Sequence, residues 1–62
     1  MANAIEVQKY LSGVDYPAGR DALVRRARDN GAPDEVVEEL QGIADREYDG
    51  PSGVSEQLSG QN

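Results

Sequence analysis

Residues 6–14, EVQKYLSGV, and residues 35–43, EVVEELQGI, read as two copies of one segment. Glu, Val, Leu and Gly occupy the same places in both copies, and Val14 is matched by Ile43. Each copy is followed by a tyrosine and then a proline. The pattern predicts a helix, a glycine stop, a connector that carries a tyrosine and a second helix, formed twice. A duplication packed about a pseudo-two-fold axis is one explanation, and chance similarity is the other.

The first helix is expected over residues 4–12. Asn3 and Glu6 have the spacing of a capping box, in which the cap and the third helical residue bond to each other's backbone. Gly13 is placed to end the helix in a left-handed C-cap. Tyr16 should be extended, because Pro17 keeps the preceding residue out of the helical region.

The second helix should begin near Gly19 or Arg20 and stop at Asn30-Gly31, a strong stop signal. Pro33 suits the first turn of a third helix, which Gly42 should end. A fourth, short helix is expected to start at Pro51.

The connectors bring the two tyrosines toward the centre of the predicted domain. The segments around Val14–Tyr16 and Glu47–Tyr48 are expected to lie close together as one antiparallel bridge. The fold class is therefore all-α: a compact domain of four short helices over residues 1–58, followed by a disordered tail over residues 59–62. The predicted core consists of Val7, Leu11, Val14, Tyr16, Leu23, Val24, Ala27, Val36, Val37, Leu40, Ile43, Tyr48, Val54 and Leu58.

The composition restricts what a chain of 62 residues can do. The net charge is -6, which weighs against binding to nucleic acid or to anionic membranes, since both need an excess of Lys and Arg. The chain has no Cys and no His, so it lacks the usual zinc ligands and the usual catalytic nucleophile–base pairs. No signal peptide or membrane span is evident, and a cytoplasmic protein without a cofactor is expected.

One acidic stretch resembles a calcium-binding loop. In the pattern D-x-[DN]-x-[DN]-G-x5-E, hard oxygen ligands alternate along the loop and a glycine forms its turn. Asp45, Asp49, Gly50 and Glu56 satisfy the pattern, whereas Glu47 is one methylene too long for its position. The alternative is a polar connector followed by a helix that starts at proline.

Arginines and tyrosines supply the other candidate binding residues. Arg25, Arg26 and Arg28 lie toward the end of the second helix, where the helix dipole favours cations, and they could dock an acidic or phosphorylated partner. Tyr16 and Tyr48 could insert between helices and bond to the backbone, or they could form an exposed aromatic pair that marks a binding surface.

The chain resembles the bacterial domain-of-unknown-function family 2795 over residues 5–58. The resemblance rests on Val7, Leu11, Gly13-Val14, Tyr16-Pro17-Ala18, Asp21, Leu23-Val24, Ala27, Gly31-Ala32, Val36, Leu40, Asp45-Arg46-Glu47-Tyr48 and Val54. Gly19, Ala44 and Gly50 depart from the residues expected there, which are Ser or Thr, Pro, and Ser. The resemblance implies a short, soluble, cytoplasmic protein of a type common in actinobacteria, and it implies no activity and no catalytic residues.

The function favoured by these observations is a small acidic, non-enzymatic module that binds an unidentified protein partner, as a monomer or a weak homodimer. One alternative is divalent-cation binding through Asp45, Glu47, Asp49 and Glu56. A second alternative is a DNA-related regulator or a DNA mimic. The sequence names no catalytic residue.

Overall fold

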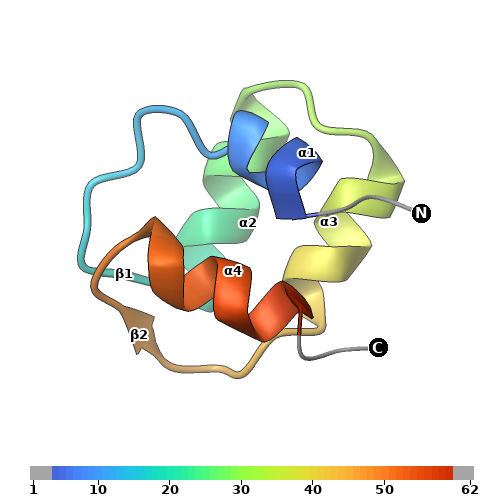
Figure 1. Cartoon of the computed structure of the whole chain (residues 1–62). Helices are drawn as coiled ribbons and strands as arrows, with labels where there is room; N and C mark the ends of the chain where they lie inside the picture. The colour runs from blue at the N-terminus through green and yellow to red at the C-terminus, as the bar shows by residue number, and fades with distance from the viewer. Residues whose placement is uncertain (1–3, 60–62) are drawn as a thin grey trace.

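The glycine and proline signals of the sequence mark the helix ends in the computed structural model, which describes residues 4–59 (Figure 1). In chain order the elements are helix α1 (Ala4–Lys9), strand β1 (Ala18–Gly19), helix α2 (Arg20–Asp29), helix α3 (Asp34–Gln41), strand β2 (Glu47–Tyr48) and helix α4 (Pro51–Ser59). Within this described range, four helices and one short antiparallel pair confirm the predicted helical fold class.

Helix α1 is shorter than predicted and ends at Lys9 rather than at residue 12. Beyond it the backbone tightens, because the Tyr10 N–H donates to the Val7 carbonyl, three residues back, at 3.0 Å. Gly13 has a φ of 86°, which confirms the predicted left-handed position after the helix. The capping-box residue Asn3 lies outside the described residues.

The second and third helices begin and end close to the predicted residues. Asn30 caps α2 and Gly31 follows with a φ of 82°. Pro33 precedes α3 as its N-cap, and Gly42 is its C-cap. Gly42 has a φ of -86°, in the right-handed region, so the two copies of the repeated segment end in different backbone conformations.

The antiparallel bridge forms beside Glu47–Tyr48 as expected, but its partner lies further along the chain. Ala18 pairs with Tyr48 and Gly19 pairs with Glu47, whereas the sequence suggested a partner within residues 14–16. Pro17 has no N–H to donate, so pairing begins after it. The bridge joins the two connectors near the first turn of α4 (Figure 1).

The core gathers one face of each helix together with Ala18 and Tyr48 of the two strands. Buried side chains are Val7, Leu11, Ala18, Leu23, Val24, Ala27, Val36, Val37, Leu40, Ile43, Tyr48, Val54 and Leu58. Val14 and Tyr16 were also predicted to be buried, but they pack at the edge of the core and are only partly covered. Ala18 was missed, because a lone alanine carries no periodic signal, and its small side chain fits where the two strands pair.

Side-chain hydrogen bonds to distant backbone groups hold the helices in place. Gln8 Nε2 in α1 donates to the Pro51 carbonyl at 2.8 Å and to Ser55 Oγ at 2.9 Å, which ties α1 to α4. Gln57 Oε1 accepts a bond from the Ala44 N–H at 3.2 Å. None of the helices within residues 4–59 combines the length and apolar composition needed to cross a membrane.

The C-terminal end differs slightly from the predicted domain boundary. Helix α4 reaches Ser59, one residue beyond the predicted end of the domain at 58. The rest of the predicted disordered tail, residues 60–62, lies outside the described residues.

Candidate functional site

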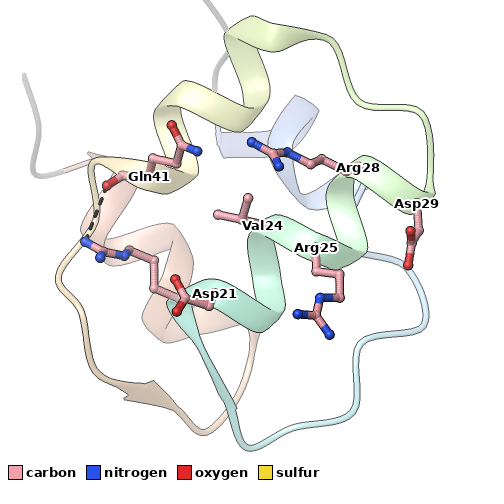
Figure 2. Close-up of a pocket in the computed structure, with 7 residues that line it drawn as sticks. Asp21, Val24, Arg25, Arg28, Asp29 and Gln41 are labelled. Carbon is pink, nitrogen blue, oxygen red and sulfur yellow. Dashed lines mark hydrogen bonds between the residues drawn. The ribbon is translucent and has the colours of Figure 1, made fainter.

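An open groove of about 550 Å³ runs along α2, beside the C-terminal end of α3 (Figure 2). Six residues of α2 and one of α3 line it: Arg20, Asp21, Val24, Arg25, Arg28, Asp29 and Gln41. The groove exists because α2 packs against α3 through Leu23, Val24 and Ala27, which leaves the neighbouring face of α2 uncovered.

Helical spacing explains the order of side chains along the groove. Residues four apart lie above one another on a helix, so Arg20, Val24 and Arg28 form one row. Asp21, Arg25 and Asp29 form the adjacent row by the same spacing. Val24 is 8% exposed and forms the apolar floor between the arginines.

Arg25 and Arg28 are three residues apart, and both line this groove. Residues three apart are neighbours on a helix surface, so both residues border the groove, and their guanidinium groups point away from each other (Figure 2). Both side chains are exposed, and Figure 2 shows them projecting from α2 on either side of Val24. Within residues 4–59 no hydrogen bond or ion pair joins either of them to another residue.

Arg20 closes one end of the groove and uses its donors internally. Its Nη1 donates to the carbonyls of Gln41 at 3.5 Å and Ile43 at 3.4 Å, at the C-terminal end of α3. Its Nη2 lies 3.6 Å from Asp45 Oδ2. Arg20 therefore positions α2 on α3, and we assign it a structural role.

Arg26 lies on the other side of α2, away from Arg28. Its guanidinium packs over Gly13, where an added Cβ would lie 3.6 Å from Nη1. With Arg25, Val14 and Asp15 it helps to line a smaller hollow of about 240 Å³ against the first connector. The three candidate arginines are thus divided between two surfaces, and Arg25 stands on the ridge between them.

The charge of the chain is unevenly distributed. Helix α2 contains four arginines and two aspartates, a net charge of +2. The remainder of the chain contains two basic and ten acidic residues, so the total of -6 leaves -8 outside α2. Arg26 lies outside the groove, so the three arginines and two aspartates of its lining carry a net charge of +1, a weakly basic surface on an acidic domain.

The two connector tyrosines occupy different environments. Tyr48 is 1% exposed, and its hydroxyl donates to the Ala44 carbonyl at 2.6 Å, which is the first of the two roles considered from the sequence. The Arg46 guanidinium carbon lies 5.1 Å from the centre of the Tyr48 ring and covers it. Tyr16 is half-buried, and burial raises the pKa of its hydroxyl above 10.0.

The exposed aromatic pair suggested by the sequence is therefore not present. Tyr48 belongs to the core, and its ring is inaccessible to a partner in this structure. Tyr16 retains some exposed surface on the connector, but it does not line the groove along α2.

The acidic stretch does not adopt the arrangement of a calcium loop. Helix α4 begins at Pro51, the seventh position of the pattern, and the Pro51 carbonyl accepts a hydrogen bond from Gln8. Gly50 lacks a positive φ, and Asp45 pairs with Arg20. Among residues 4–59, no three acidic side chains are grouped as a metal ion would require, so Glu47, Asp49 and Glu56 remain dispersed and exposed.

Sequence reasoning missed part of this site. Val24 was expected only in the core, and Gln41 and Arg20 were not candidates. The four-residue spacing of Arg20, Val24 and Arg28 was a readable signal for a shared row. The participation of Gln41 depends on how α3 packs on α2, for which the sequence gives no local signal.

Comparison with known protein families gives a match. A family described as "Protein of unknown function (DUF2795)" matches residues 2–55, which is most of the chain. No curated protein and no solved structure matches the chain.

Proposed function

The chain belongs to the DUF2795 family of proteins of unknown function, and we propose that it is a non-enzymatic protein-interaction module that binds its partner through the groove along α2. The observation that carries this proposal is the pair formed by Arg25 and Arg28. Each guanidinium has five N–H donors, and no described residue uses any of them in these two side chains. A bound partner would supply the missing acceptors.

A non-enzymatic role is supported by the chemistry of the groove. It contains guanidinium, carboxylate and amide groups but no thiol or imidazole, because the chain has no Cys and no His. Asp21 and Asp29 are exposed to solvent, whereas a pair of catalytic carboxylates needs a pocket that separates their pKa values. A cytoplasmic location and a monomeric or weakly dimeric state form part of the proposal.

Site-specific photo-crosslinking in cells tests this function. Gln41 is exposed at the rim of the groove, so replacing it with photoreactive p-benzoylphenylalanine leaves the arginines intact. Lys9 is also exposed, on α1 and outside the residues that line the groove, and serves as the control position. We expect a reproducible adduct of discrete mass from position 41 and none from position 9.

Two results would contradict the proposal. One is the absence of any adduct from position 41, or the same adducts from both positions. The other is chemical conversion of the recovered partner by substoichiometric amounts of the chain, which would show an enzyme.

A further inference from the structure

We infer that the partner presents a short acidic peptide segment to this groove, whose carboxylates pair with Arg25 and Arg28 across Val24. The inference rests on the proposed function and adds the chemistry of the partner to it. Arginine is suited to this task, because its planar fork binds a carboxylate through two parallel hydrogen bonds. Val24 provides an apolar floor for the methylene groups of a Glu side chain.

Charge complementarity favours an acidic segment and also limits its length. Arg25 and Arg28 attract carboxylates, while Asp21 and Asp29, which flank Arg25 in its row, repel any that miss the arginines. The net charge of -8 on the rest of the chain repels a polyanion that extends beyond the groove. A short acidic segment fits these conditions, whereas duplex nucleic acid, with its continuous phosphate charge, does not.

A second copy of the chain is a less suitable occupant than another protein. The acidic surfaces of this domain lie outside α2, so a copy that docked one of them into the groove would make a head-to-tail contact. Head-to-tail contacts form rings or open filaments rather than simple dimers. The net charge of -6 on each copy also opposes association.

The test measures the fluorescence anisotropy of fluorescein-labelled hexaglutamate as the purified full chain is added in low-salt buffer. We expect saturable binding that weakens as salt is added, because exposed ion pairs are screened. Labelled hexaglutamine should show no binding. Arg28→Glu and Arg25→Glu should each weaken hexaglutamate binding by about tenfold or more, and Arg28→Lys should retain part of the affinity.

The matched control is Lys9→Glu. Lys9 and Arg28 both lie in the last turn of a helix, and reversal of either charge changes the net charge of the chain from -6 to -8. Lys9→Glu should therefore keep its affinity within about threefold of the original chain if the groove, rather than the net charge, binds the peptide. Circular dichroism spectra establish that each variant is folded.

Several results would overturn the inference. It would be overturned if hexaglutamine bound as well as hexaglutamate, or if Lys9→Glu and Arg28→Glu lost affinity equally. It would also be overturned if duplex DNA displaced the peptide at a lower concentration than unlabelled hexaglutamate does. Self-association of the chain, in sedimentation, that Arg28→Glu abolishes would overturn it as well. A crosslink from position 41 without hexaglutamate binding would refute the acidic character of the partner but leave the proposed interaction function standing. Hexaglutamate binding without any crosslink from position 41 would refute the proposed interaction function itself.

Discussion

Asn30 and Arg20 stand at opposite ends of α2, and each donates hydrogen bonds to carbonyl groups near the end of one copy of the repeated segment. Asn30 Nδ2 donates to the Ser12 carbonyl at 3.1 Å, and Arg20 Nη1 donates to the Gln41 carbonyl at 3.5 Å. Ser12 and Gln41 occupy the same place in the two copies. The two ends of α2 thus provide hydrogen-bond donors to C-terminal carbonyl groups of both segments, so the repeated residues have a structural role.

Asn30→Ala should lower the free energy of unfolding by about 1 kcal/mol, since it removes the donor to the Ser12 and Tyr10 carbonyls. Asn30→Asp should cost more, because a carboxylate cannot donate and repels the carbonyl oxygens. Urea denaturation followed by circular dichroism measures both. Equal stability of Asn30→Asp and the original chain would contradict the capping role.

Tyr48→Phe should lower the free energy of unfolding by about 1 kcal/mol, because the ring stays in the core while the bond to the Ala44 carbonyl is lost. Tyr16→Phe is the matched control. Its hydroxyl makes no hydrogen bond to another residue within residues 4–59, so the change should alter stability by less than about 0.5 kcal/mol near neutral pH. Thermal or urea unfolding of the two variants should rank them in this order, and the reverse order would refute the assignment.

Two glycine-to-alanine changes should have opposite effects on stability. Gly53 lies in α4, and an added Cβ would be 3.4 Å from Tyr48 Cδ1, an ordinary contact, so Gly53→Ala should stabilise the protein by about 0.5 kcal/mol through helix propensity. Gly31 has a φ of 82°, so Gly31→Ala should destabilise it by about 1 kcal/mol or more. Denaturation midpoints measure both changes, and stabilisation by Gly31→Ala would contradict the left-handed conformation.

Tyr16 should make the protein less stable in alkali. Burial raises the pKa of its hydroxyl in the folded state above 10.0, so the folded state favours the protonated form. The stabilisation from this preference is complete below about pH 10 and is lost as the pH rises through the higher folded pKa. Urea unfolding across this range should show a steeper fall in stability for the original chain than for Tyr16→Phe. Parallel curves would contradict the burial effect.

Local signals in the sequence account for most of the fold. Glycine and proline affect the backbone conformation of their immediate neighbours, so Gly31, Gly42 and Pro51 mark helix ends that can be read from the sequence. The bonds of Gln8 to Pro51 and of Asn30 to Tyr10 join residues far apart in the chain, and no local pattern specifies them.

The candidate site divides in the same way. The arginines on α2 were recognisable from their concentration in one helix, and helical spacing alone would have placed Arg25 beside Arg28. The groove itself depends on α3, which brings Gln41 opposite Val24. Tyr48 is buried and Tyr16 only half-buried because of which residues pair in the bridge. Pro17 has no N–H to donate, so the pairing involves Ala18 and Gly19 rather than the expected residues 14–16.

The central claim is that the groove along α2 binds an acidic segment. The most direct measurement titrates the isotopically labelled chain with hexaglutamate and monitors the amide chemical shifts in NMR spectra. The account predicts that the largest saturable shifts occur within residues 20–29 and at Gln41, that they vanish in Arg28→Glu, and that α1 and α4 are little affected. Shifts centred on the 45–56 segment or on α1, or an unchanged titration in Arg28→Glu, would contradict it.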